Sequence, residues 1–149
     1  MKTRFVLTIF ALAGMAYAAQ PVASVTSGAP FYLRGNSVNV AGVPDWTVMS
    51  GDEISTQTGQ AVILLRNGSR VALSANSRAQ IDSSDQTFAV RLLSGSLRVL
   101  SASSGLRVYV RGSLTSPSVG DLVSAGGAAN TAGAPSAKML LSVGPISRK

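Results

Sequence analysis

Short segments in which apolar and polar residues alternate, separated by turns, occupy residues 51–110. Near the end of this stretch, for example, Leu106, Val108 and Val110 alternate with Arg107 and Tyr109. Successive side chains of a β-strand point to opposite faces of its sheet, so this alternation predicts strands with one buried face. Short strands that recur about every eight to twelve residues are typical of a sandwich, barrel or roll. The pattern therefore predicts an all-β fold in which short antiparallel hairpins stack into a β-roll or sandwich.

The clearest hairpin is centred on Asn67-Gly68. A largely apolar segment, residues 60–66, precedes this pair, and residues 69–74 follow it. Asn and Gly tolerate the positive φ angles of a type I′ turn, whose twist matches that of the flanking strands. We therefore predict that the two segments pair across a two-residue type I′ turn.

Further strands are predicted on both sides of this hairpin, around residues 22–26, 31–33, 37–40, 78–81, 87–93, 97–100 and 106–111. Beyond Gly112 the chain becomes rich in Ser, Gly, Ala and Pro, a composition typical of flexible linkers. We predict a β domain over residues 22–111 and a flexible tail over residues 112–149. The apolar segment 139–143 of this tail is predicted to dock as one more strand.

The N-terminus has the organisation of a secretory signal peptide. Lys2 and Arg4 precede an apolar run over residues 5–16, and Ala16 and Ala18 provide small residues before a cleavage point. A retained anchor helix is the alternative, but a membrane span needs roughly 20 apolar residues and Gln20-Pro21 follows too soon. We therefore predict that residues 1–18 form a cleaved signal helix. The mature protein is expected to be periplasmic or secreted, without a stable membrane span.

Composition limits how the mature protein can be stabilised. The chain has no cysteine, so the fold must depend on its hydrophobic core rather than on disulfides. Cleavage after Ala18 leaves enough residues for one domain with a substantial core, and too few for two. Removal of Lys2 and Arg4 lowers the basic residues from 13 to 11 against six acids, a net charge of +5.

The residue types that most often carry catalysis are nearly absent. There is no His or Cys and only one Glu, Glu53, so a Ser-His-Asp triad or a zinc, copper or haem site has no ligands. Asp52 and Glu53 are neighbours and point to opposite faces of an extended strand, which is poor geometry for an acid–base pair. Asp82 and Asp85 flank a turn, and two carboxylates supply too few oxygen ligands for a typical Ca²⁺ site. We predict a protein that is not an enzyme and has no cofactor or metal.

Arginine supplies ten of the thirteen basic residues, and its planar guanidinium binds carboxylate or phosphate through two hydrogen bonds. Such residues commonly form no more than a solubilising surface. Alternating strands would also gather several of them on one outer face, which would attract an anionic polysaccharide or a lipid headgroup. Nucleic acid is not expected as a partner, because aromatic and basic residues are not interleaved and the chain is exported. The candidate face comprises Arg66, Arg70, Arg78, Arg91, Arg98, Arg107 and Arg111.

A series of short motifs resembles a known family. A GD-x-I-x-T segment at residues 51–56 is followed by Asn67-Gly68-Ser69, then by residues 75–77, and the series ends with Leu-Ser-Gly-Ser-Leu at residues 93–97. This order resembles the FecR domain, named for a periplasmic sensor of ferric-citrate signalling, over roughly residues 22–110. The motif residues to which we assign turn-making and fold-making roles are Gly51, Asp52, Ile54, Thr56, Asn67, Gly68, Ser69 and Gly95.

The resemblance implies an all-β fold and a role in protein contact rather than catalysis. Members that act as sensors cross the inner membrane, carry a cytoplasmic segment that controls a sigma factor, and contact an outer-membrane transporter. We expect this chain to depart from that plan, with a cleavable signal and no cytoplasmic segment. We therefore expect a module that binds or scaffolds another envelope component. A partner strand could add to an open sheet edge at residues 22–26 or 106–111, and self-association is an alternative use of such an edge.

Overall fold

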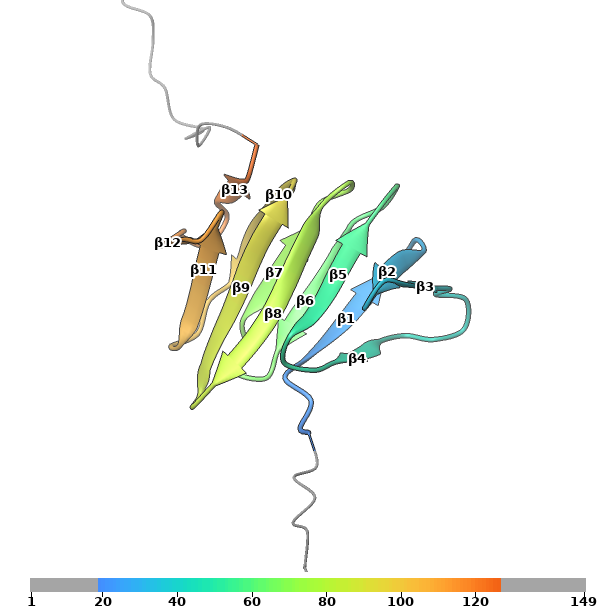
Figure 1. The fold of residues 1–149 in the computed structure, drawn as a ribbon, viewed down its shortest axis with the longest axis horizontal. Helices are drawn as coiled ribbons and strands as arrows, with labels where there is room; N and C mark the ends of the chain where they lie inside the picture. The colour runs from blue at the N-terminus through green and yellow to red at the C-terminus, as the bar shows by residue number, and fades with distance from the viewer. Residues whose placement is uncertain (1–18, 127–149) are drawn as a thin grey trace, which may run out of the picture.

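The computed structural model describes residues 19–126, which contain thirteen β-strands and no helix. The strands form two sheets (Figure 1). Sheet A contains, in spatial order, β13 (Leu122–Ser124), β10 (Ser96–Ser101), β7 (Arg70–Leu73), β6 (Ala61–Leu65), β1 (Ala23–Ser27) and β4 (Trp46–Val48). Sheet B contains β12 (Ser113–Thr115), β11 (Leu106–Val110), β9 (Thr87–Ser94), β8 (Arg78–Ser84), β5 (Asp52–Thr56), β2 (Phe31–Leu33) and β3 (Asn36–Val38).

The two sheets pack face to face around one core. Alternate residues of most of the longer strands are buried, as in β5, where Ile54 is fully buried between the partly exposed Glu53 and Ser55. Inward-facing side chains of both sheets, such as Ile63 of β6 and Val90 of β9, belong to the same buried cluster. The all-β prediction is confirmed, and of its two alternatives the arrangement is a sandwich.

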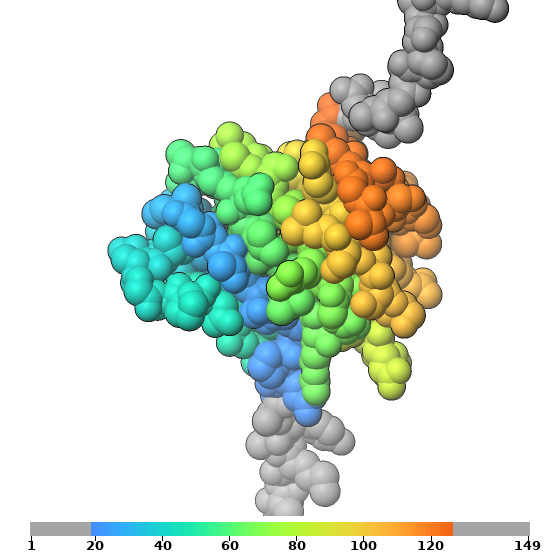
Figure 2. All heavy atoms as spheres, turned by 180° about the vertical axis from the view of Figure 1, so that it is seen from behind, coloured from blue at the N-terminus to red at the C-terminus, as the bar shows by residue number. Residues whose placement is uncertain are grey.

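The chain advances steadily along the sandwich while it passes between the sheets. Strands β6 and β7 lie in sheet A, β8 and β9 in sheet B, β10 in sheet A, and β11 and β12 in sheet B. The colours in Figures 1 and 2 accordingly run from blue and cyan through green to gold and orange across the molecule, seen from the two opposite sides. Segments close in sequence are therefore close in space.

One pair of strands differs from the antiparallel expectation. Strand β11 pairs with β9 in parallel, with Val108 opposite Val90 and Tyr109 opposite Arg91. The reason is that β10 lies in the other sheet. The chain leaves sheet B after β9, returns along sheet A, and re-enters sheet B in the original direction. Alternation within a segment does not reveal this, because it is the same in parallel and antiparallel strands.

The hairpin at Asn67-Gly68 is present, but its turn is not the predicted type I′. Strand β6 ends at Leu65 and β7 begins at Arg70, and Gly68 is the residue of this turn with a positive φ, 87°. The Gly68 N–H donates to the Leu65 carbonyl, and the Leu65 N–H donates to the Ser69 carbonyl. This is a three-residue loop in which Gly68 occupies a bulge position.

Three other hairpin turns have two consecutive residues with positive φ, the feature of type I′. They are Arg34-Gly35 between β2 and β3, Asp85-Gln86 between β8 and β9, and Arg111-Gly112 between β11 and β12. Glycine occupies the second position of two of these turns, whereas Gln86 (φ 71°) adopts the left-handed conformation with a side chain attached.

The predicted domain boundary at residue 111 is wrong. Strands β12 and β13 continue the two sheets to Ser124, and Ala125 is buried at the edge of the core. Each strand has only three residues, too few to produce a recognisable alternation within a stretch rich in small residues. The predicted signal helix (residues 1–18) and the docked segment 139–143 lie outside the described residues.

The predicted open edges are also wrong. Strand β1 lies between β6 and β4, and β11 lies between β9 and β12. The sheet edges in the described residues are β3, β4, β12 and β13, which are three residues long each. Such short edges offer few free backbone groups, which limits the addition of a partner strand.

Replacement of Gln86 by Gly is expected to stabilise the protein by about 0.5–1 kcal/mol. A left-handed conformation costs a non-glycine residue roughly 1–2 kcal/mol, and the extra freedom of Gly in the unfolded chain offsets part of this gain. Urea unfolding measures the difference. Gln86→Ala is the matched control, because it removes the side chain but keeps Cβ. Equal stabilities of the Gly and Ala variants would contradict the strain at this turn.

Candidate functional site

Several motif residues lie where the chain crosses between the sheets. Thr56, at the end of β5, donates through Oγ1 to the Ser74 carbonyl and accepts from the Ser77 N–H at 3.1 Å. The Ser77 hydroxyl in turn accepts from the Ser96 N–H at 2.9 Å. Gly95 is the single residue between β9 of sheet B and β10 of sheet A. These contacts join three crossings at one corner of the sandwich.

Gly95 is tightly surrounded at this corner. Its φ is +76°, and a Cβ built there would lie 2.2 Å from Ser77 Oγ and 2.7 Å from the Asn76 carbonyl oxygen. The position therefore requires glycine for two reasons: its backbone conformation is left-handed, and there is no space for a Cβ atom.

The Asn67-Gly68-Ser69 turn secures a crossing at the opposite end of the sandwich. Asn67 Nδ2 donates to the Ser104 carbonyl at 3.1 Å, and its Oδ1 accepts from the Ser69 N–H. The buried Ser69 hydroxyl accepts from the Ser103 N–H at 2.9 Å. The loop from β10 to β11 is thus held against the hairpin.

Asp52, directly after Gly51 (φ 88°), links β5 to the turn after β2. Arg34 donates to its carboxylate through Nε and Nη2, both at 2.6 Å, and the Met49 N–H donates to it at 2.7 Å. Burial alone raises the pKa of Asp52, but these hydrogen bonds and the charge of Arg34 outweigh it and hold the pKa below its usual value. Arg34 was not among the predicted site residues, because the pair forms across 18 positions of sequence.

The seven arginines predicted to share a face are divided between the two outer surfaces of the sandwich. Arg70 of β7 and Arg98 of β10 are exposed on sheet A, and Arg66 continues the outward phase of β6. Arg78 of β8, Arg91 of β9 and Arg107 of β11 are on sheet B, and Arg111 follows β11. The single arginine face is therefore wrong, because consecutive strands of this chain belong to different sheets.

On sheet B, two of the arginines are neutralised by carboxylates. Arg78 Nη2 lies 2.6 Å from Glu53 Oε1, and Arg91 Nε lies 2.7 Å from Asp82 Oδ2. The guanidinium of Arg91 also lies over the ring of Tyr109, 4.9 Å from its centroid. Neither partner of Arg91 was recognised, since the Tyr109 contact depends on the parallel register of β9 and β11 and the Asp82 contact on the register of the β8–β9 hairpin.

The outer face of sheet A has a different character. None of its six strands contains Asp or Glu, although Asp45 and Asp121 precede β4 and β13. Arg70 lies opposite Leu64, and Arg98 lies opposite Leu122, with each leucine more than a third exposed. We call the exposed arginines and leucines of this surface the sheet A face: Leu64, Arg66, Arg70, Arg98, Leu100 and Leu122.

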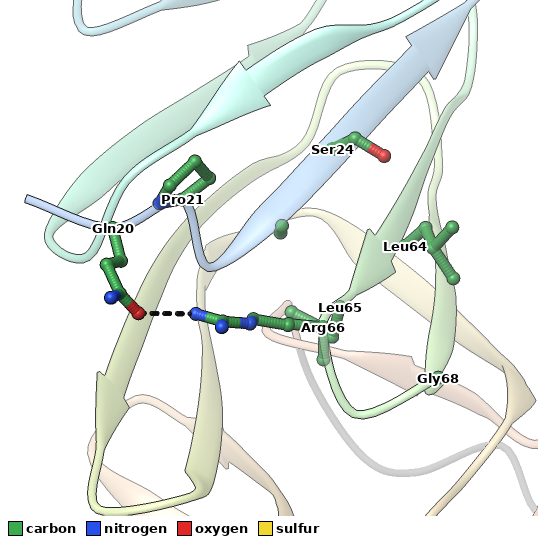
Figure 3. A pocket seen from close by; sticks show the side chains of 8 residues that line it. Gln20, Pro21, Ser24, Leu64, Leu65, Arg66 and Gly68 are labelled. Atoms are coloured by element: carbon green, nitrogen blue, oxygen red, sulfur yellow. Dashed lines mark hydrogen bonds between the residues drawn. The ribbon is translucent and has the colours of Figure 1, made fainter.

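A hollow of about 520 Å³ opens at one end of the sheet A face. Figure 3 shows Ser24 and Leu64 on neighbouring strands, with Pro21 and the Arg66 side chain beside them. Arg66 Nη1 donates to Gln20 Oε1 at 2.8 Å, which holds the guanidinium across the opening (Figure 3). The hollow therefore combines an apolar wall with a cation.

Among residues 19–126, no group of three or more Asp or Glu side chains is placed to hold a metal ion. In the same residues, no helix is long and apolar enough to cross a bilayer.

The fold and its crossings define an all-β sandwich domain in which the recurring polar and glycine residues shape the turns. Residues 52–117 match the family model described as FecR protein, so this part of the chain is a FecR domain, and the predicted resemblance is confirmed. The match begins at β5, so it does not include β1 to β4. No curated protein and no solved structure matches the chain.

Replacement of Gly95 by Ala is expected to lower the free energy of unfolding by about 3 kcal/mol or more, through a left-handed penalty of about 1–2 kcal/mol plus overpacking of about 1–3 kcal/mol. Gly112→Ala is the matched control, because Gly112 also has a positive φ but open space around it. Its expected loss is about 1–2 kcal/mol. Equal losses in urea unfolding would show that contact with Ser77 is not the constraint.

Asp52 is expected to make the fold sensitive to acid. Its pKa is lower in the folded chain than in the unfolded chain, so its stabilisation is complete above about pH 4 and is lost as the pH falls further. Asp52→Asn should be less stable by about 1–3 kcal/mol at pH 7 and should lose less stability than wild type between pH 7 and pH 3. Unfolding at both pH values tests this, with Asp45→Asn as control. A parallel acid response in wild type and Asp52→Asn would contradict it.

Proposed function

We propose that the protein is a non-enzymatic, exported module that binds another component of the cell envelope through the sheet A face. The FecR domain supports this class of function, because such domains are typically associated with the envelope. The N-terminal signal sequence supports export of the mature chain.

The choice of surface rests on the pairing of the arginines: two of the four assigned to sheet B are paired with carboxylates, and none of the three on sheet A is, within the described residues. On sheet B, Arg78 and Arg91 are paired with carboxylates of the same sheet. On sheet A, Arg66, Arg70 and Arg98 have no carboxylate partner within residues 19–126. An arginine that is not neutralised within its own domain is available for a carboxylate of a partner.

The leucines distinguish this face from a merely solubilising one. Leu64, Leu100 and Leu122 are 38%, 41% and 45% exposed, and they alternate with the arginines across neighbouring strands. Arginine beside exposed apolar residues is the composition of protein interfaces, whereas a solubilising surface mixes charges of both signs. The partner that fits is an envelope protein with an acidic surface that also presents apolar side chains.

An anionic polysaccharide or a lipid headgroup is the second candidate partner, and the same three arginines favour it. Purely electrostatic attraction to such a polymer weakens steeply with ionic strength, whereas a contact that also buries the leucines is retained at higher salt.

The double variant Arg70→Glu/Arg98→Glu is expected to reduce recovery of a cross-linked partner from envelope extract at least tenfold, since desolvated interface arginines each contribute about 2 kcal/mol or more. Arg107→Glu/Arg111→Glu, with the same change of charge on sheet B, should recover the partner as wild type does. Equal loss in both variants, or retained recovery in the first, would overturn the sheet A face as the binding surface.

A salt series with anionic vesicles and with envelope polysaccharide separates the two candidate partners. Binding to either that disappears by physiological salt and depends on Arg70 and Arg98 would favour the anionic ligand over a protein.

A further inference from the structure

A second hollow lies on the outer face of sheet B, around Ala89. Asp82 of β8 is directly opposite Ala89, and Arg107 of β11 is its parallel partner on the other side. Arg91 and Thr87 are two residues away along β9 on the same face. Because the side chain of Ala89 ends at Cβ, this ring of longer side chains leaves an open space of about 440 Å³.

One wall of the hollow is a pair of arginines from neighbouring strands. Arg91 is held in place by Asp82 through its Nε and by the ring of Tyr109 beneath its guanidinium. Its terminal amino groups donate to no other group of the described residues, so two contacts orient the guanidinium while leaving donors available. Arg107 makes no ion pair within residues 19–126. Arg91 therefore offers hydrogen-bond donors to the hollow, and Arg107 supplies the unpaired positive charge of this wall.

The other wall is rich in acceptors and hydroxyl groups. Ser84, Asp85 and Thr87, around the β8–β9 turn, line the hollow. A ligand that satisfies both walls carries an anionic group at one end and several hydroxyls at the other. The carboxylates of Asp82 and Asp85 would repel a highly charged anion such as a phosphate dianion, which favours a ligand with one negative charge.

We propose that this hollow binds an acidic sugar residue of a glycan. The carboxylate of the sugar would lie between Arg91 and Arg107, where guanidinium groups hydrogen-bond it well. The ring hydroxyls would reach Ser84, Asp85 and Thr87, and the apolar edge of the ring would pass over Ala89. The site lies on sheet B, so it does not depend on the sheet A face.

Titration of the exported protein with oligosaccharides of glucuronic acid, followed by calorimetry or by NMR of the amides of β8, β9 and β11, tests the proposal. Wild type should bind the acidic oligosaccharide at least tenfold more tightly than an uncharged glucose oligomer of the same linkage. Arg107→Gln should weaken binding at least tenfold. Arg111→Gln, the same change in the β11–β12 turn outside the hollow, should leave binding unchanged.

Ala89→Leu is expected to abolish binding by filling the hollow while leaving every charge in place. Urea unfolding confirms that this variant is folded, and Arg107→Gln, at an exposed position, tests the site independently of it. No binding by wild type would overturn the proposal. Equal effects of Arg111→Gln and Arg107→Gln would also overturn it, because they would indicate diffuse charge attraction. Partner recovery by the sheet A variants is measured separately from glycan binding at the hollow. Failure of the proposed function can therefore be distinguished from failure of this proposal.

Discussion

The sandwich depends on hydrogen bonds at the places where the chain leaves one sheet for the other. Backbone groups at such crossings lose their ladder partners, and buried groups without partners are costly. Here side-chain hydroxyls replace the missing ladder. The hydroxyls of Thr56 and Ser77 form hydrogen bonds with backbone groups of the crossings at one corner. The Ser69 hydroxyl does the same at the opposite end. Gly95 permits the close approach that this arrangement requires.

This explains why the residues that carry the family resemblance are turn residues and small hydroxyl residues. They determine how the chain passes between the layers, and they leave both outer faces free to differ in charge and shape. The two outer faces of this domain differ accordingly. Sheet B forms ion pairs across neighbouring strands, and sheet A places arginine beside exposed leucine. The FecR match therefore specifies the scaffold of residues 52–117 more closely than the partner.

The sequence predicted the local features of the fold better than the relations between distant strands. Strand β11 and the buried position of Val108 followed from alternation, because the periodicity is a property of a single strand. The parallel pairing of β9 with β11 did not, since it depends on the sheet into which the intervening strand folds. The arginines were separated for the same reason. Arg98 and Arg107 are near in sequence and share the outward phase, yet they face opposite sides of the molecule.

The steady advance of the chain along the sandwich has a consequence for how the protein acquires its structure. Apart from β1 and β6, hydrogen-bonded strands lie no more than about three strands apart along the chain, so the loop entropy lost before each new strand is held is limited. A polypeptide delivered N-terminus first through a narrow channel can thus complete its layers in the order in which they emerge. Strand β1 can pair with β6 only after β6 has emerged. Each later crossing then adds a strand to sheets that have already begun to form. A topology of this kind suits folding as the chain emerges, and without cysteine no disulfide can trap an early intermediate.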